Sequence, residues 1–200
     1  MNLSPSASRE ETDLPMRVIN PGERNRSLAA EVKERSGTDF NRCYQCRSCA
    51  NGCPFVAGMD YPPNAVLRLV QYGLAQEALE SKTIWVCAGC HTCSSQCPMG
   101  IDIPGVMGAL RLIALEQGAA VARPDILEFH EAVLHSLKSY GRAHKLGIMW
   151  RYKLRTRHWF SDLDVGLKML AKRKLELRPS RVKAIKEIAD LFKCHGQESR

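Results

Sequence analysis

The stretch RCYQCRSCANGCPF, residues 42–55, holds four cysteines at spacings of three, three and four positions, and a proline follows the last of them. The stretch VCAGCHTCSSQCPM, residues 86–99, repeats this arrangement 44 positions later. Together the two quartets contain eight of the nine cysteines, and the ninth is Cys194. In a reducing compartment, clustered thiols bind metal or carry redox chemistry more often than they form disulfides. The eight candidate ligands are Cys43, Cys46, Cys49, Cys53, Cys87, Cys90, Cys93 and Cys97.

The spacing within each quartet is typical of proteins that bind cubane 4Fe–4S clusters. Three cysteines in the pattern Cys-x-x-Cys-x-x-Cys allow one loop to reach three irons, and the proline turns the chain away after the fourth cysteine. In two-cluster ferredoxins that fourth cysteine binds the other cluster. We therefore predict two 4Fe–4S clusters with crossed ligation. The predicted ligand sets are Cys43, Cys46, Cys49 and Cys97 for one cluster, and Cys87, Cys90, Cys93 and Cys53 for the other.

The main alternative is a pair of structural zinc sites, which usually combine one Cys-x₂₋₄-Cys pair with a second pair at a distance. Three successive cysteines at spacing three favour iron–sulfur clusters over zinc. Four thiolates per cluster leave no open position for a substrate, so we predict an electron carrier with no catalytic residue; catalysis at a cluster is the less favoured alternative. Basic residues beside the ligands would raise the cluster potentials, or they are simply solvated loop charges. These neighbours are Arg42, Arg47, Lys82 and His91.

The rest of the sequence predicts an all-α fold, because apolar residues recur at helical spacing and no sustained alternation indicates a sheet. Each quartet is followed by an acid, a proline near a helix start and the letters LRL within an apolar helix, which indicates an internal duplication. The predicted apolar stripes are Val66, Leu67, Val70 and Leu74 after the first quartet, Val106, Leu110, Ile113 and Ala114 after the second, and Ile126, Val133, Leu134 and Leu137 in the helix expected from Pro124. The predicted helices run from Ser27, as the N-terminal cap, to about residue 37, from Pro62 or Pro63 to about residue 75, from Pro104 to about residue 119, and over residues 124–138, 161–177 and 180–193.

Composition and charge divide the chain into three predicted parts. Residues 1–26 are polar and read as a flexible arm, residues 27–122 as the two-cluster domain, and residues 123–200 as a basic helical extension. The formal charge of +8 falls to about +4 once eight thiolates and two 2+ cluster cores are included. Much of the basic excess therefore balances the clusters and does not require a nucleic-acid partner.

The extension carries the remaining basic excess, with sixteen Lys and Arg against five Asp and Glu over residues 138–193. We expect it to dock a partner protein of the same complex, and a solvated helical face is the nearest alternative. The stretch WRYKLRTRHWF, residues 150–160, interleaves aromatic and basic residues, which keeps nucleic acid and anionic lipid as further alternatives. We expect Trp150, Trp159 and Phe160 to act as core or interface anchors.

The stretches SGTDFNRCYQCRSCANGCPF and WVCAGCHTCSSQCPMGIDIPGVM resemble the C subunit of heterodisulfide reductase. The resemblance extends over residues 28–195 and is most specific over residues 37–107. It implies an α-helical ferredoxin module with two duplicated cluster-binding units. It also implies two partners: the flavoprotein that forms the A subunit, and the disulfide-active B subunit with its cysteine-rich CCG motifs. This chain contains no adjacent Cys-Cys pair, which fits a relay between those partners rather than the catalytic component.

The expected function is therefore electron transfer within a heterodisulfide reductase-type oxidoreductase complex, in methanogenesis or sulfur metabolism. The alternative is the iron–sulfur subunit of a membrane-associated dehydrogenase that serves a quinone or haem partner, although the cysteines of its usual 2Fe–2S domain are missing from this sequence. The N-terminus lacks the basic start and apolar core of a signal peptide. No apolar run approaches the roughly 18 residues of a membrane span, so we expect a cytoplasmic protein.

Overall fold

The computed structural model describes residues 26–156, 182 and 184–195. This part of the chain contains helices and no strands, which confirms the predicted all-α class. The helices are α1 (Arg26–Ser36), α2 (Ser48–Asn51), α3 (Pro63–Gln71), α4 (Ala75–Leu79), α5 (Lys82–Val86), α6 (Thr92–Ser95), α7 (Ile103–Glu116), α8 (Pro124–Tyr140), α9 (Lys145–Thr156) and α11 (Ile185–His195), with 3-10 turns at Phe40–Arg42 and Val56–Gly58.

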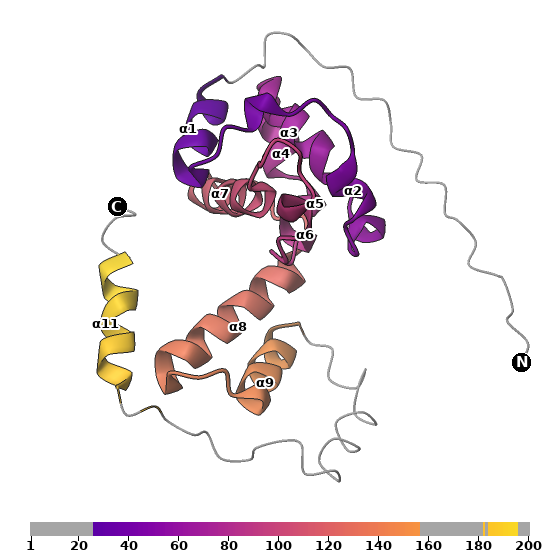
Figure 1. Cartoon of the computed structure of the whole chain (residues 1–200). Helices are drawn as coiled ribbons and strands as arrows, with labels where there is room; N and C mark the ends of the chain where they lie inside the picture. Colours follow the sequence, from indigo (N-terminus) through magenta and orange to yellow (C-terminus); the bar gives the residue numbers. More distant parts are fainter. Residues whose placement is uncertain (1–25, 157–181, 183, 196–200) are drawn as a thin grey trace, which may run out of the picture.

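We call residues 26–122, which carry both cysteine quartets, the cluster-bearing half of the molecule. Helix α7 is at its centre, where it contacts α1, α4, α5 and α6 (Figure 1). The predicted apolar stripe of this helix is confirmed, since Val106, Leu110 and Ile113 are fully buried. Pro104 lies in the first turn of α7, where the missing proline N–H has no intrahelical partner to lose. The buried apolar face of α7 therefore packs against α5, which leads into Cys87, and against α6, which carries Cys93.

Helix α3 ends earlier than the sequence pattern predicts. Gly73 takes a φ of +74°, a left-handed conformation that terminates helices. The N–H of Leu74 donates to Leu69 O at 2.9 Å, which closes the turn. Leu74 is buried, as its place in the apolar stripe predicts, but it lies beyond α3 and directly precedes α4.

Helix α1 begins at Arg26, one residue before the predicted cap at Ser27. Its last turn is tied to the last turn of α7, because Arg35 donates to both carboxylate oxygens of Glu116 at 2.8 and 2.6 Å. The following turn buries Phe40 completely against the core. This turn leads directly into Cys43 and so fixes the start of the first quartet.

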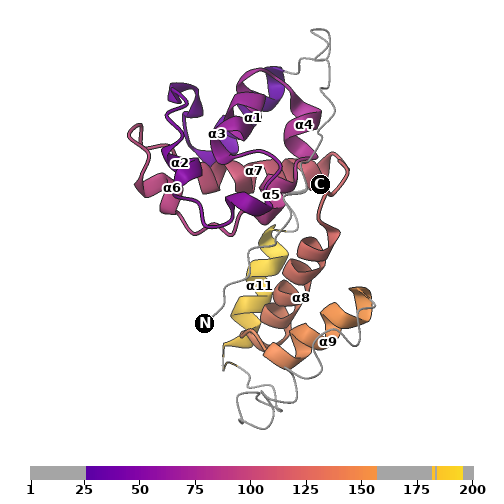
Figure 2. The same cartoon turned by 90° about the vertical axis from the view of Figure 1, so that its right-hand side faces the viewer.

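Helix α8 leaves the cluster-bearing half and packs against α9 and α11 (Figures 1 and 2). Its predicted apolar stripe is only partly correct, because Leu134 is 51% exposed and the buried residues are Ala132 and Ser136. The Ser136 hydroxyl donates to Arg142 O at 3.0 Å and accepts from the His144 N–H at 2.8 Å. A small polar residue is needed there because the α8–α9 turn folds back onto it.

Several predictions fall on other parts of the chain. Residues 1–25 of the arm, the helix expected over 161–177, and residues Trp159 and Phe160 lie outside the described residues. The last helix was expected from Ser180 and its described part begins at Ile185. None of the described helices has the length and apolar character needed to cross a bilayer.

Candidate iron–sulfur sites

Two cavities lie beside the N-terminal end of α7, and each is lined by four cysteines. The Cys43 cavity has a volume of about 280 Å³ and the Cys87 cavity about 380 Å³, each measured with the space at its open mouth. The Cys43 cavity is lined by Cys43, Cys46, Cys49 and Cys97, and the Cys87 cavity by Cys53, Cys87, Cys90 and Cys93. This is the grouping predicted from the crossed pattern, while ligation by these thiols stays a prediction.

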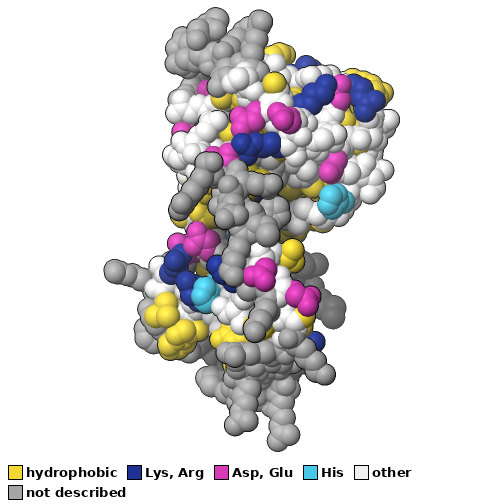
Figure 3. All heavy atoms as spheres, turned by 90° about the vertical axis from the view of Figure 1, so that its left-hand side faces the viewer, with side chains coloured by type: hydrophobic (Ala, Val, Ile, Leu, Met, Phe, Trp, Pro, Cys, Tyr) yellow, Lys and Arg dark blue, Asp and Glu magenta, His cyan; other side chains and the backbone are white. Residues whose placement is uncertain are grey.

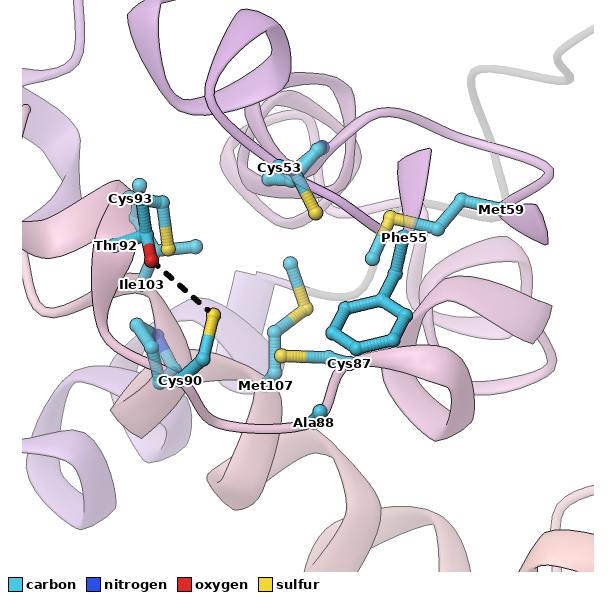
Figure 4. Close-up of a pocket in the computed structure, with 12 residues that line it drawn as sticks. Cys53, Phe55, Met59, Cys87, Ala88, Cys90, Thr92, Cys93, Ile103 and Met107 are labelled. Carbon is cyan, nitrogen blue, oxygen red and sulfur yellow. Dashed lines mark hydrogen bonds between the residues drawn. The ribbon is translucent and has the colours of Figure 1, made fainter. Parts of the chain in front are cut away.

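The crossing follows from how α2 and α6 lie against each other. Each of these short helices is followed, after one residue, by the fourth cysteine of its quartet, Cys53 or Cys97. Gly52 has no side chain, and a Cβ there would collide with the side chain of Gln96, the residue before Cys97. This close approach lets each fourth cysteine reach the cavity of the opposite quartet. Figure 4 shows Cys53 across the Cys87 cavity from Cys87 and Cys90, with its sulfur toward them.

The two cysteine loops take the same backbone course. Arg47 and His91, at equivalent positions, both have a left-handed conformation, with φ of 65° and 58°. α2 or α6 begins at the next residue in each case. The first turn of these helices buries Cys49 and Cys93, while the preceding cysteines of both loops remain exposed. Each loop therefore presents one buried and one exposed thiol to its cavity.

Hydroxyl groups contact the exposed thiols in both loops. Ser48 Oγ lies 3.4 Å from Cys46 Sγ, and Thr92 Oγ1 lies 3.5 Å from Cys90 Sγ. These contacts lower the pKa of both thiols, because a hydrogen bond stabilises the thiolate. Thiolate is the form that binds metal.

Burial has the opposite effect on the pKa of the two buried thiols, Cys49 and Cys93. It raises the pKa of Cys93 to about 11, and the neighbouring Cys87 adds to the shift. The pKa of Cys49 is also raised, first by burial and then by Cys43. Anionic sulfur is costly in an apolar setting unless a cation compensates it. Four thiolates around one cavity thus fit a positively charged group bound between them.

The two cavities differ in polarity. Phe55, Met59 and Met107 line the Cys87 cavity (Figure 4), whereas Arg47 and Asn64 line the Cys43 cavity. Ile103, which is 2% exposed, lines both. The two cavities are therefore neighbours separated at Ile103.

Of the four basic neighbours predicted from sequence, Arg47 is the only one among the described residues that line these cavities. His91 Nδ1 instead lies 3.5 Å from Asp102 Oδ1. The side chains of Arg42 and Lys82 are exposed. The sequence places these charges near the cysteines but does not show where their side chains point.

Three residues with roles at the site were missed by the sequence analysis. The Gln45 side chain donates to Cys43 Sγ at 3.4 Å and is hydrogen-bonded to Asn64. Arg111 of α7 donates to the carbonyl oxygens of Ile84 and Cys87, and so holds the start of the second quartet. The repeated LRL letters contained a signal for Arg111, because an arginine within an apolar helix needs buried partners.

The donor set fits iron–sulfur clusters. Each cavity offers four thiols from two separate segments, with the cavity volume between them. Among the described residues, no three His, Cys, Asp or Glu side chains come together as a group that could hold a single metal ion. A cubane instead takes one thiolate at each of four separate irons.

Comparison with known proteins agrees with this chemistry. Residues 39–101 match a domain family described as a 4Fe-4S dicluster domain. The chain is 36% identical over 86 residues to the iron–sulfur C subunit of CoB–CoM heterodisulfide reductase from Methanopyrus kandleri, which covers 43% of this chain and 45% of the relative. It is 36% identical over 111 residues to a second form of the C subunit of this reductase, from Methanocaldococcus jannaschii, covering 52% and 59%. The chain thus spans about half the length of these curated relatives.

A longer match is found in Archaeoglobus profundus. A protein described there as similar to the C subunit of heterodisulfide reductase is 32% identical over 144 residues, which cover 72% of this chain and 68% of the relative. The resemblance expected from the two quartets is confirmed: the chain belongs to the family of heterodisulfide reductase iron–sulfur C subunits.

Proposed function

We propose that this chain relays electrons through two 4Fe–4S clusters between a flavin-containing subunit and a disulfide-active subunit of a heterodisulfide reductase-type complex. Its family is that of an iron–sulfur subunit of an oxidoreductase. Beyond this family membership, we propose that the chain holds two clusters, that the eight thiols are their ligands, and that it has these two partners.

The grouping of eight thiols into two adjacent cavities carries this proposal. Cys43, Cys46, Cys49 and Cys97 would hold one cluster, and Cys53, Cys87, Cys90 and Cys93 the other. When bound, a 4Fe–4S cluster takes up and gives back single electrons without a change of ligands. Because each cavity supplies four thiols, every iron has a protein ligand and none is left for a substrate.

The position of Ile103 supports transfer between the two sites. Its side chain is buried and lines both cavities, so the two ligand sets lie next to each other. The outer cysteines, Cys46 and Cys90, lie at the surface. The ligand sets thus combine a short internal path with exposed points at which a partner protein can approach.

The partners are inferred from family membership. The relatives' names describe subunits of CoB–CoM heterodisulfide reductases, and the present chain has no adjacent Cys-Cys pair of the kind expected in the disulfide-active subunit. We propose that the disulfide is reduced on a partner and that this chain only delivers the electrons.

Oxygen-free purification of the tagged chain from its native host, followed by identification of the bound proteins, tests the partners. Recovery of a flavoprotein and a protein with CCG motifs would support the proposal. A variant with all four cysteines of the Cys43 cavity changed to alanine serves as the control for electron flow, measured as flavin-dependent disulfide reduction by the complex.

Cluster content provides a separate test on the same preparation. We expect about eight iron atoms and eight acid-labile sulfides per chain for two 4Fe–4S clusters. Zinc in place of iron would overturn the cluster assignment. Recovery of a membrane cytochrome in place of the two expected proteins would overturn the proposed partners and leave the clusters in place.

A further inference from the structure

The two cysteine loops differ at one position that faces the cavities. Gln45 and Gly89 occupy equivalent places between the first and second cysteines, and both have a left-handed φ, 61° for Gln45 and 66° for Gly89. Glycine adopts this conformation without strain, whereas a residue with a side chain does so at a cost. The first loop therefore retains a strained glutamine where the second loop uses glycine.

The Gln45 side chain is held in one place by the start of α3. Its amide nitrogen donates to Asn64 O at 3.0 Å, and its amide oxygen accepts from Asn64 Nδ2 at 2.8 Å. Asn64 is only 6% exposed. These two hydrogen bonds compensate the strained backbone and fix the glutamine beside the cavity.

The same amide nitrogen lies 3.4 Å from Cys43 Sγ. Its orientation follows from its partners, because a backbone carbonyl such as Asn64 O can only accept. A flipped Gln45 amide would place two oxygens against each other. The group that faces the Cys43 sulfur is therefore an N–H donor. The buried Asn64 Oδ1 has no hydrogen-bond partner among the described residues, which is the cost of turning the Asn64 donor toward Gln45.

The second loop has no side chain with which to make this contact. Gly89 offers none, although a Cβ there would meet no atom within 4 Å of it. The hydroxyl contacts to Cys46 and Cys90 are nearly the same in the two loops. The donor from Gln45 is thus a difference between two loops whose hydroxyl contacts to sulfur are otherwise matched.

We propose that Gln45 raises the reduction potential of the cluster in the Cys43 cavity. This inference rests on the proposed function, since it assumes that both cavities hold 4Fe–4S clusters. Reduction adds negative charge that spreads onto the ligand sulfurs, and a hydrogen bond to sulfur stabilises that charge. An N–H donor near Cys43 Sγ therefore favours the reduced state.

The linings of the two cavities also favour a higher reduction potential in the Cys43 cavity. Arg47 lines the Cys43 cavity and adds positive charge there, whereas Phe55, Met59 and Met107 give the other cavity an apolar wall. The guanidinium of Arg111, partly buried beside Cys87, acts on the other cluster in the opposite sense, so the effect of Gln45 is read on the potential of its own cluster. Gln45 is a positioning residue, since it tunes a ligand and binds no substrate.

The test is a redox titration of the purified full chain, followed by electron paramagnetic resonance, which reads each cluster without any turnover. Gln45→Gly copies the second loop and keeps the left-handed backbone accessible. We expect it to lower the potential of one cluster and leave the other unchanged. Gln45→Glu replaces the donor with a negatively charged acceptor of similar size, and we expect a larger fall of the same potential.

Gln117→Glu is the matched control for the added charge. Gln117 follows the last turn of α7, and the fourteen residues of this helix place it about 20 Å from the cavities at the other end. Cys46→Ala assigns the signals, because it should remove the signal of the Cys43 cavity. The signal that responds to Gln45 must be the one that this variant removes.

The outcomes separate the two proposals. If the wild-type chain holds no pair of 4Fe–4S signals, the proposed function fails. If both signals are present and Gln45→Gly and Gln45→Glu leave both potentials unchanged, or shift the signal that survives Cys46→Ala, then only the role of Gln45 is overturned.

Discussion

At the scale of single residues, the fourth cysteine of each quartet decides whether the two quartets form one unit or two. Cys97 lines the same cavity as Cys46, and Cys53 lines the same cavity as Cys90. Two independent sites would instead keep each fourth cysteine with its own quartet. The difference concerns only these two side chains, so pairs of substitutions can distinguish the arrangements.

We expect the double variant Cys46→Ala/Cys97→Ala to keep about four iron atoms per chain, because both changes affect one 4Fe–4S cluster. The matched double variant Cys46→Ala/Cys53→Ala should lose nearly all its iron, because each change affects a different cluster. Iron and sulfide analysis of anaerobically purified protein measures both. The reverse pattern would show that each quartet binds its own cluster.

Phe40 shows how a core residue supports the first quartet. It is fully buried three residues before Cys43, and we expect Phe40→Ala to lower the free energy of unfolding by about 3–5 kcal/mol because it leaves a cavity. Denaturant unfolding followed by circular dichroism measures the change. Tyr44→Ala is the control, since Tyr44 is 63% exposed. Equal effects of the two variants would contradict the packing role of Phe40.

At the scale of helices, the two arginines of the LRL repeats, Arg68 and Arg111, make different contacts. Arg111 donates to carbonyl oxygens of Ile84 and Cys87 and is partly buried, which lowers its pKa through desolvation. Arg68 donates to Gln71 in its own helix at 3.1 Å and lies over the ring of Tyr72. One arginine thus joins α7 to α5, while the other stays on α3.

We expect Arg111→Met to destabilise the fold by about 1–3 kcal/mol for each carbonyl left without a partner. It should also speed loss of the cluster in the Cys87 cavity, because the carbonyl of Cys87 loses its anchor. The rate at which a chelator bleaches the visible absorption measures this loss. Arg68→Met is the matched control, and equal bleaching rates in both variants would refute the joining role of Arg111.

At the scale of the whole molecule, the cluster-bearing half and the extension differ in charge. Figure 3 shows acidic and basic side chains next to each other on both the upper and the lower half. Residues 138–156, from the end of α8 through α9, contain six Lys and Arg and no Asp or Glu. Lys138, Arg142 and Lys145 are exposed around the turn between these helices, and we propose that this turn docks an acidic surface of a partner protein in the complex.

Reversal of these charges tests the docking. We expect Lys138→Glu/Arg142→Glu/Lys145→Glu to slow association with the partner proteins at low salt by tenfold or more, roughly the range over which electrostatic steering acts. The difference from wild type should shrink as salt is raised. Binding kinetics with the purified partners measure both effects, and an unchanged iron content checks that the clusters are intact. Unaltered association at low salt would rule out docking at this turn.

Much of the fold could be predicted because its signals are local. The buried stripe of α7 and the proline starts of α3, α7 and α8 follow from periodicity and from the chemistry of proline. The buried face of α8 was predicted less well, because the polar Ser136 is buried under the α8–α9 turn, to which it is hydrogen-bonded. The mixed basic and aromatic sequence of helix α9 did not predict a helix there.

The sequence by itself determined the chemistry: eight thiols in two spaced quartets, each ended by a proline, and helices around them. Spacing along the chain is enough for this, since a loop of fixed length can present only certain ligands to a cube. Only the tertiary structure decided what surrounds each set of thiols. The Asn64 contact that orients the Gln45 donor, the Arg111 anchor at Cys87 and the shared wall at Ile103 join segments 19 to 60 positions apart. Such contacts depend on how the helices pack, which local patterns do not record.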